Sequence, residues 1–240
     1  MKKGWIYSEN EIHRNWFEKL KRGDKKIEGR DWYFLIYEKK MNLIMSILKE
    51  LRDKKILDAG CGEGVLVEEF RSIGYDIEGL DPNYESDFVR NGDITSTDYP
   101  NNHFDVVLLL DVLEHIPYNM QYKALEEIKR ILKPDGMFII SFPNVANLSS
   151  RIKFALIGEL SRTDKDYNHL GERTYKEIKR ILESYRFSIQ KIYSITPTIP
   201  VVWQLITLFP DRMRKIHDLI NLIKIPDISL ITIFICKNIK

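Results

Sequence analysis

The sequence predicts an α/β fold in which helices cover both faces of a mostly parallel sheet. From residue 55 onward, apolar strand-like segments alternate with helix-like segments, a pattern typical of parallel sheets. The segment Phe104–Leu110 is apolar at nearly every position, as expected for a central strand buried on both faces. Another strand ends at Asp58 and runs into three glycines, Gly60, Gly62 and Gly64, at every second position.

Hydrophobic periodicity and turn residues place the elements in order. Residues 5–22 and 32–51 are expected to be helices, joined by a charged loop at 21–30, and together residues 1–52 form an N-terminal helical cap. Residues 53–240 form the core. Its strands are expected at 55–59, 76–80, 88–90, 104–110, 137–141, 187–194 and 229–236, and its helices at 65–73, 118–132, 147–157 and 174–185. The segment 133–136, Lys-Pro-Asp-Gly, predicts a turn, and Thr174 with Glu177 predicts a capping box.

A helical insert is expected at about residues 195–227, between the last two strands. Four prolines divide it, and its two amphipathic pieces lie at 201–209 and 211–224. Apolar side chains such as Trp203 and Phe209 lie near the basic cluster at 212–215. An apolar face beside basic residues is typical of membrane-interface helices. Packing against the core, a homodimer and peripheral membrane contact all remain open for this segment.

Composition restricts the class of protein. The 240 residues carry a net charge of only +2, which argues against a nucleic-acid partner. The two cysteines, Cys61 and Cys236, lie far apart, as in reduced cytosolic proteins. The first residues lack the apolar core of a secretion signal, and the longest apolar run, at 228–236, is shorter than the ~20 residues of a spanning helix. We therefore expect a cytoplasmic protein, with peripheral membrane contact left open.

The glycine-rich bend after Asp58 predicts a site for a nucleotide-like cofactor. Glycine lacks a Cβ, so a ligand can rest on the backbone there, and the free amides of the next helix favour an anionic group. A dinucleotide motif requires a glycine or alanine where this chain has Val65. A phosphate-binding loop requires a Gly-Lys-Ser/Thr ending, which this chain lacks. An acidic residue about 20 positions later, Asp81, is placed to accept hydrogen bonds from ribose hydroxyls.

The pattern Asp58-x-Gly60-x-Gly62-x-Gly64 resembles motif I of the class I S-adenosylmethionine-dependent methyltransferases. This resemblance implies a Rossmann-like, seven-stranded, mostly parallel sheet whose last strand is antiparallel, with S-adenosylmethionine as the cofactor. Within the superfamily the chain is most similar to the branch of ubiquinone-biosynthesis O-methyltransferases and of methyltransferases in methionine or surface-glycan metabolism. The similar segments are Leu113-Glu114-His115, Phe142-Pro143-Asn144, Asn168-His169-Leu170 and Trp32-Tyr33-Phe34. Tyr37 and Glu38 depart from the arginines that relatives often have there.

The resemblance also implies roles around the cofactor. Asp58 and the Gly60 backbone would hold the ammonium, and Asp93 and the Ile94 amide would contact the adenine. Leu110 or Asp111 would lie beside the sulfonium. We interpret Cys61 as a small filling residue and not as a nucleophile. The expected cofactor-binding set is Asp58, Gly60, Cys61, Gly62, Asp81, Pro82, Asp93, Ile94, Leu110 and Asp111.

Two histidines are the candidate catalytic residues. His115 is the best candidate for a base, because an unperturbed histidine titrates near about 6.5; a purely structural role in ordering its loop is the alternative. His169 is expected on a loop over the site. A third interpretation is a metal site in which Asp111, Glu114 and His115 would be ligands and His169 would complete the set. We nevertheless expect no bound metal. The acceptor is expected to contact Trp32, Tyr33, Asn144 and His169.

The function expected from these features is S-adenosylmethionine-dependent O-methylation of a small molecule or of a glycan or lipid intermediate, by in-line methyl transfer. Three alternatives remain. The first is a metal-assisted RNA 2′-O-methyltransferase, against which the near-neutral charge counts. The second is a cofactor-binding protein without transfer activity. The third is a nicotinamide dehydrogenase, which Val65 disfavours.

Overall fold

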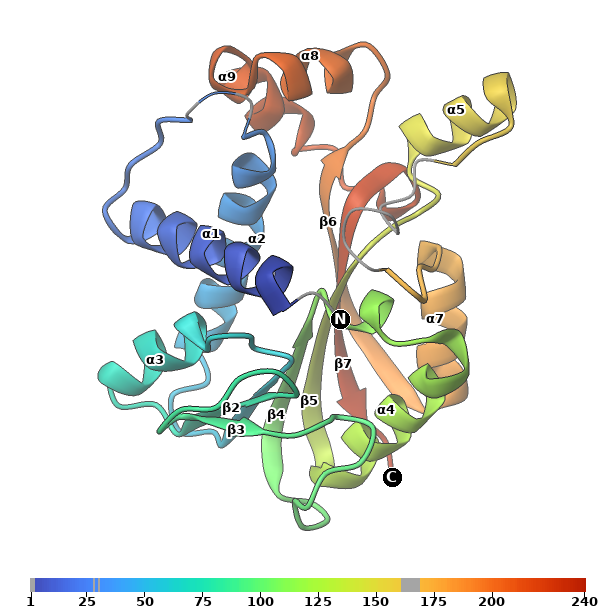
Figure 1. Ribbon diagram of the computed structural model, residues 1–240. Coiled ribbons are helices and arrows are strands. Elements are labelled where there is room, and N and C mark those ends of the chain that lie inside the picture. Colours follow the sequence, from blue (N-terminus) through green and yellow to red (C-terminus); the bar gives the residue numbers. More distant parts are fainter. Residues whose placement is uncertain (1–2, 28, 30, 161–168) are drawn as a thin grey trace.

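A computed structural model describes residues 3–27, 29, 31–160 and 169–240, with side chains from residue 12 onward (Figure 1). The helices are α1 (Lys3–Lys21), α2 (Tyr33–Lys49), α3 (Val65–Ser72), α4 (Tyr118–Ile131), α5 (Leu148–Ile157), α7 (Tyr175–Ser184), α8 (Val202–Leu208) and α9 (Pro210–Ile220), with short 3₁₀ turns η1 (Leu113–His115) and η2 (Pro226–Ile228). The strands are β1 (Ile56–Ala59), β2 (Ile77–Asp81), β3 (Val89–Asn91), β4 (Phe104–Leu110), β5 (Leu132–Pro143), β6 (Phe187–Pro197) and β7 (Ser229–Asn238).

The seven strands form one sheet in the order β3-β2-β1-β4-β5-β7-β6. The pairs from β3 to β5 are parallel, whereas β7 runs antiparallel to both of its neighbours, β5 and β6. This confirms the predicted fold class, including the direction of the last strand. Strand order reverses between β1 and β4, and ligands of open α/β sheets bind beyond the strand ends at such a point.

Helices cover both faces of this sheet, and each face has its own buried cluster (Figure 1). On one face α2 and α3 pack on the strands, through residues such as Ile44 and Phe70. On the other face α4 and α7 contribute Leu125 and Leu182. Because α2 belongs to the same buried cluster as the sheet, it forms part of the structural core. The division between a helical cap ending at residue 52 and a core beginning at residue 53 stays a prediction.

The predicted turn at residues 133–136 lies inside the span of β5. The pairing of β4 with β5 jumps from Leu132 to Met137, so the four turn residues bulge out of the ladder. Asp135 has φ 59° there, and a Cβ on Gly136 would lie 2.8 Å from the Lys133 carbonyl oxygen. The backbone leaves the strand path at these residues and returns to it, which is why β5 is longer than the predicted segment 137–141.

The insert between β6 and β7 contains α8, α9 and η2, and one face of it packs against the rest of the chain. Ile206 and Ile220 are buried, and the ring of Trp203 meets that of Trp32 edge to face at 5.0 Å. Glu38 forms an ion pair with Arg214 of α9. Glu38 therefore connects α2 to the insert.

A helix that crosses a bilayer must be both long and apolar. None of the helices in the described part of the chain meets both conditions.

Candidate active site

The glycine-rich bend lies between the end of β1 and the start of α3. Gly60, Gly62 and Gly64 all have positive φ, at 76°, 57° and 71°. A Cβ on Gly60 would lie 2.4 Å from a methyl of Val112, which follows β4. The bend is therefore restricted to glycine both by its backbone conformation and by the loop that faces it.

Asp81, at the end of β2, holds this bend through a hydrogen bond to its backbone. One carboxylate oxygen accepts from the Gly62 amide at 2.9 Å, and the other accepts from the Asn83 amide at 2.8 Å. A carboxylate has about four acceptor positions, so two amide contacts leave capacity for ribose hydroxyls. Pro82 follows as an exposed residue.

Asp58 is a buried carboxyl at the end of β1. Its pKa is raised to about 7, chiefly by burial and then by the nearby Asp81 carboxylate, against a lowering effect of Lys40. No described residue donates a hydrogen bond to its side chain. A buried acid of this kind is suited to a cationic partner, because a positive ligand would stabilise the ionised form that burial disfavours.

The remaining cofactor candidates lie around the same end of the sheet. Asp93 is exposed and accepts from the Thr95 amide at 2.8 Å, while Ile94 is buried. Cys61 places its sulfur where a Cβ on Gly79 would come within 2.5 Å, and burial raises the pKa of its thiol. A protonated thiol packed against a strand agrees with a filling role.

The end of β4 carries an ion pair that sequence reasoning missed. Asp111 has φ 55°, accepts from the Ser141 hydroxyl at 2.5 Å and pairs with the Lys40 ammonium. Burial alone would raise the pKa of Asp111, but Lys40 and Ser141 hold it below its ordinary value. Lys40 lies on the buried face of α2, in helical register with Tyr37 and Ile44. A lysine within an apolar helical stripe is the signal that would have found it.

Two segments far apart in sequence bring three potential metal ligands together. Glu114, His115 and His169 place one ligand atom each within 4.8 Å of one another. The two imidazole rings meet edge to face at 4.7 Å, and His169 Nδ1 lies 3.0 Å from an oxygen of Glu172. His115 is exposed, whereas Glu114 is buried. Burial, followed by repulsion from Asp111, raises the pKa of Glu114 well above its ordinary value.

The predicted acceptor residues are not all in one place. His169 lies beside His115, whereas Trp32 and Tyr33 belong to an aromatic cluster between α2 and the insert. Asn144 is 1% exposed, donates to the carbonyl oxygens of Pro226, Asp227 and Ser229, and accepts from the amides of Ala146 and Tyr175. Its polar atoms are committed to backbone, so we do not propose Asn144 as an acceptor contact.

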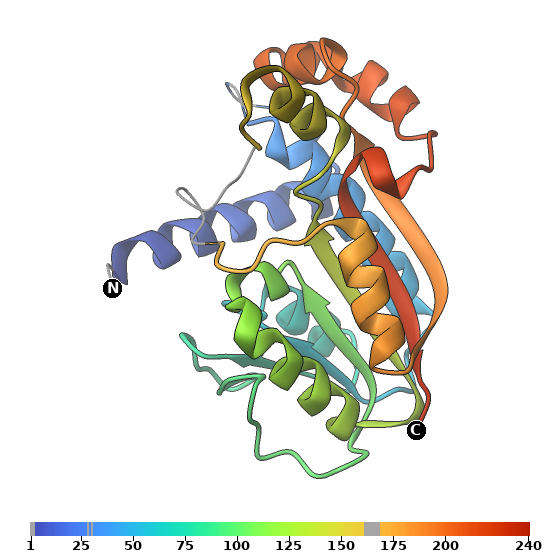
Figure 2. The same cartoon turned by 90° about the vertical axis from the view of Figure 1, so that its right-hand side faces the viewer.

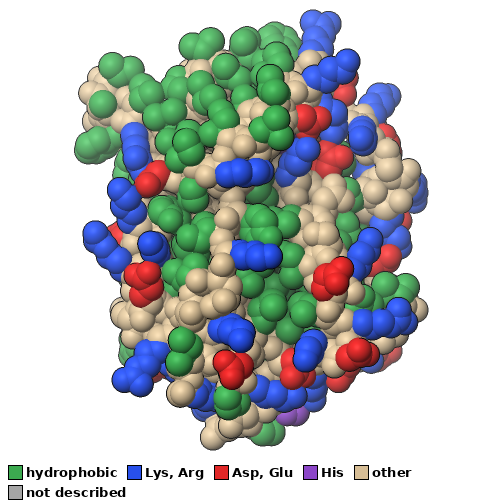
Figure 3. Space-filling view, turned by 180° about the vertical axis from the view of Figure 1, so that it is seen from behind, with side chains coloured by type: hydrophobic (Ala, Val, Ile, Leu, Met, Phe, Trp, Pro, Cys, Tyr) green, Lys and Arg blue, Asp and Glu red, His purple; other side chains and the backbone are tan. Residues whose placement is uncertain are grey.

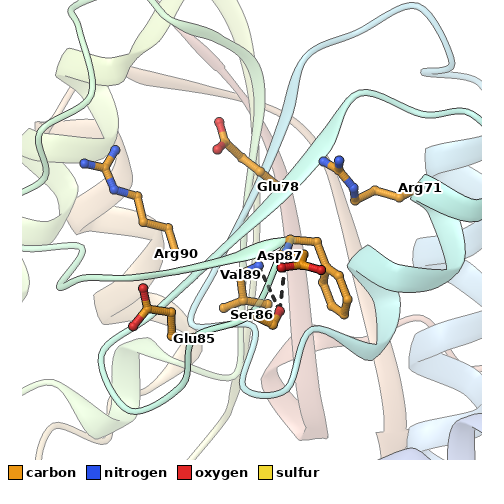
Figure 4. A pocket seen from close by; sticks show the side chains of 8 residues that line it. Arg71, Glu78, Glu85, Ser86, Asp87, Val89 and Arg90 are labelled. Atoms are coloured by element: carbon orange, nitrogen blue, oxygen red, sulfur yellow. Dashed lines mark hydrogen bonds between the residues drawn. The ribbon is translucent and has the colours of Figure 1, made fainter.

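A surface hollow of about 260 Å³ lies elsewhere, at the β3 edge of the sheet (Figure 4). Its lining includes Arg71, Glu78 and Arg90, and the Ser86 hydroxyl accepts from two amides there. None of its lining residues belongs to the cofactor or catalytic sets. It is an open, charged hollow whose lining contains no histidine or cysteine, and we assign it no part in the reaction.

Comparison with known proteins identifies the family. A family model described as a methyltransferase domain matches residues 32–191. An uncharacterized protein of Methanocaldococcus jannaschii is 30% identical over 172 residues, covering 69% of this chain and 72% of that protein. The ubiquinone biosynthesis O-methyltransferase of Haemophilus ducreyi is 32% identical over 124 residues, covering 44% of this chain and 52% of that enzyme. The chain thus spans about half the length of this last relative.

The fold has known counterparts as well. The crystal structure of an S-adenosylmethionine-dependent methyltransferase from Archaeoglobus fulgidus superposes with a TM-score of 0.55 at 22% identity, covering 86% of this chain and all of that one. The chain belongs to the methyltransferase-domain family, and it is an enzyme that uses S-adenosylmethionine. Membership removes the nicotinamide dehydrogenase from the alternatives.

The described residues fit this cofactor. The unpaired, buried Asp58 carboxyl suits an ammonium group. Asp81 retains acceptor capacity at the end of β2 for ribose hydroxyls. The two carboxyls are supplied by β1 and by β2, which are adjacent in the sheet.

Proposed function

We propose that this enzyme methylates a hydroxyl oxygen of a small molecule or of a glycan or lipid intermediate. The observation that carries the proposal is the position of His115, an exposed imidazole held between the end of β4 and the segment of His169. Deprotonation of a hydroxyl acceptor requires a base that the acceptor can reach, and His115 is exposed in the 3₁₀ turn that follows the predicted sulfonium contact, Asp111. The ubiquinone O-methyltransferases among the relatives support oxygen as the acceptor atom.

On the cofactor side, the protein binds and orients. S-adenosylmethionine supplies a methyl group on a positively charged sulfur. In this proposal Asp58 accepts from the ammonium, Asp81 accepts from the ribose hydroxyls, and Asp93 with the Ile94 amide contacts the adenine. Leu110 flanks the sulfonium, and Cys61, Gly62 and Pro82 shape the bend.

On the acceptor side, His115 takes the hydroxyl proton as the acceptor oxygen attacks the methyl carbon. The new bond is C–O, the broken bond is C–S, and the electron pair of the broken bond goes to sulfur. His169, whose Nδ1 lies 3.0 Å from a carboxylate oxygen of Glu172, acts as a positioning residue that fixes the angle of the His115 ring.

Lys40 is a further positioning residue in this scheme. Its ammonium is buried and pairs with Asp111, whose other oxygen accepts from Ser141. The pair holds Asp111 in its left-handed backbone conformation at the point where the methyl group would pass. It also connects α2 to the end of β4, so a movement of α2 would shift the Asp111 side chain.

The test is an acceptor panel with S-adenosylhomocysteine formation as the readout. The panel contains phenols and catechols, sugar hydroxyls, and a lipid-linked acceptor, each with an amine or thiol analogue of the same shape. Turnover with a hydroxyl acceptor and loss of that turnover in His115→Ala would support the proposal. Turnover restricted to the amine or thiol analogues would contradict O-methylation.

A second candidate is metal-assisted transfer to the 2′-hydroxyl of an RNA. The specific observation in its favour is the convergence of Glu114, His115 and His169 within 4.8 Å. One oxygen of Glu114 is buried and has no hydrogen-bond partner among the described residues, so it is available to coordinate a cation. A divalent ion here would polarise the acceptor hydroxyl. The small net charge of +2 counts against a nucleic-acid acceptor.

Metal removal separates the two candidates. If histidine acts as the base, activity after dialysis against EDTA stays at the level of the undialysed enzyme. If a cation is required, activity falls and returns with Mg²⁺ or Mn²⁺, and Glu114→Gln loses that rescue. Short single-stranded RNA with a free 2′-hydroxyl then decides whether the metal-dependent activity uses nucleic acid.

A further inference from the structure

Large apolar side chains are exposed together at one end of the molecule. They lie on α5, on the helices of the insert and on the turn after α9, and the most exposed are Leu156 at 78% and Leu222 at 72%. Figure 3 shows hydrophobic side chains gathered at the end where Figure 1 places α5, α8 and α9. We call this the apolar end surface and define it by Phe154, Leu156, Ile157, Leu208, Leu219 and Leu222.

These side chains are exposed although the backbone that carries them is firmly held. In the insert, Ile206 and Ile220 are buried on the opposite side of α8 and α9. At the start of α5, the Ser149 hydroxyl donates to the Thr198 carbonyl oxygen at 2.9 Å. Exposure on well-anchored helices indicates a surface that a partner covers, because monomeric proteins rarely expose large contiguous apolar patches.

Direct contacts join α5 to both ends of the insert, so the two segments present one surface. Thr198, at the start of the insert, also accepts from the Ser149 amide at 3.1 Å. Arg151 on α5 pairs with Asp227 of η2 at 3.1 Å. Figure 2 shows α5, α8 and α9 together at the same end in a second view. Segments separated by about forty residues in sequence therefore form a single exposed face.

Positive charge accompanies this face. Arg212 and Lys215 on α9 have no carboxylate partner among the described residues. Two of the three acidic side chains of the segment 198–228 are already paired, Asp218 with Lys39 at 2.7 Å and Asp227 with Arg151. An apolar surface with unpaired cations on the same helices is the arrangement that binds anionic lipid headgroups.

We propose that the apolar end surface docks on an anionic lipid bilayer, with α5, α8 and α9 lying in the membrane interface. A second copy of the chain fits this surface less well, because a two-fold interface would bring both sets of unpaired cations into one contact. The surface lies beyond the carboxyl ends of the parallel strands, at the end of the molecule that holds the active site (Figure 1). This docking goes beyond the proposed methyl transfer and would present a lipid-linked acceptor to it.

The test is co-sedimentation of the full chain with vesicles of phosphatidylcholine, with and without phosphatidylglycerol. The wild-type protein is expected to bind the anionic vesicles and to bind the neutral ones several-fold more weakly. Leu156→Glu/Leu222→Glu is expected to bind the anionic vesicles at least about tenfold more weakly, since it removes two exposed leucines that would enter the bilayer. Ile239→Glu, a matched change at an exposed apolar residue next to the C-terminus at the opposite end, should bind like the wild type.

A charge arm distinguishes lipid headgroups from a general apolar affinity. Arg212→Gln/Lys215→Gln should lower binding by about fivefold for each charge removed, whereas Lys123→Gln/Lys191→Gln, at exposed lysines on α4 and β6, should not. Thermal melting checks that every variant is folded, and His115→Ala should bind vesicles normally, so failure of methyl transfer is measured separately. Equal vesicle binding by Leu156→Glu/Leu222→Glu and the wild type would overturn the proposal. So would a dimer that this variant dissociates in the absence of any lipid binding.

Discussion

The cofactor half and the acceptor half of the active site are built in different ways. The cofactor half consists of three short segments: the end of β1, the glycine bend and the end of β2. The Asp81 carboxylate accepts from the Gly62 amide and so holds the bend against β2. The acceptor half is assembled from α2, the end of β4, β5 and the segment that begins at His169, through side-chain contacts such as Lys40–Asp111. A ligand held by backbone geometry leaves a local sequence motif, whereas a ligand held by converging side chains does not.

The largest expected effect separates the two halves at the chemical step. His115→Ala should lower kcat by about 10²–10⁴-fold, the usual contribution of a general base, and leave the Kd for S-adenosylhomocysteine unchanged. Single-turnover kinetics and calorimetry measure the two quantities. His103→Ala, a histidine at the start of β4 beside Lys55, is the control and should keep the wild-type rate. Equal losses in turnover and in cofactor affinity would make His115 a structural residue of the cofactor half.

The second effect tests whether the cofactor half depends on its backbone. Gly60→Ala introduces a Cβ 2.4 Å from Val112 at a residue with φ 76°, and strain and overlap together cost about 3 kcal/mol. The Kd for S-adenosylhomocysteine should therefore rise about a hundredfold. Gly23→Ala is the matched control, since Gly23 has φ 66° and a methyl group added there would meet nothing within 4 Å.

A rescue sharpens the same point. Adding Val112→Ala to Gly60→Ala removes the methyl groups that the new Cβ meets, so part of the lost affinity should return. The backbone strain at residue 60 remains in the double variant, and recovery should be incomplete. Wild-type affinity in Gly60→Ala alone would show that the bend is not the cofactor site.

The third effect concerns the ribose contact. Asp81→Ala should weaken cofactor binding by roughly 1–3 kcal/mol, the value of a hydrogen bond to a charged group. Asp81→Asn retains an oxygen that can accept from the Gly62 amide, and it should lose less. Asp87→Ala, at an exposed aspartate in the following loop, serves as the control. Isothermal calorimetry decides the result, and an unchanged affinity in Asp81→Ala would remove this residue from the site.

Much of this architecture follows from the sequence, for a physical reason. The seven strands and the cofactor bend are recognisable because apolar periodicity and glycine spacing are local properties. The apolar run at Phe104–Leu110 and the capping box at Thr174 and Glu177 are examples that the structure confirms. The bulge inside β5 was not predicted, since a turn signal does not reveal whether the strand resumes its path on the same partner.

The acceptor half shows where such prediction stops. Asn144 follows β5 directly, yet its amide donates to the backbone carbonyl oxygens of Pro226, Asp227 and Ser229. Lys40 lies 71 residues from Asp111 in sequence, so only the packing of α2 on the sheet brings them together. The Glu38–Arg214 pair spans 176 residues and likewise depends on where the insert packs.

The smallest expected effect is a pH dependence confined to the cofactor half. The pKa of Asp58 is raised to about 7 in the cofactor-free protein, and an ammonium group beside it would lower that value. The affinity for S-adenosylhomocysteine should therefore increase with pH, by at most about tenfold per unit, up to pH about 7 and then level off. Asparagine has the same shape as aspartate and does not titrate. The affinity of Asp58→Asn for S-adenosylhomocysteine should therefore not change with pH over this range.

Proton release on cofactor binding tests the central claim, that the acid at the end of β1 receives the ammonium, most directly. Calorimetric titrations of S-adenosylhomocysteine at pH 6, in two buffers with different ionisation heats, count the protons released. Asp58 is mostly protonated at that pH when free and ionised when paired, so the wild type should release most of one proton and Asp58→Asn almost none. The same proton count in both proteins would contradict the account.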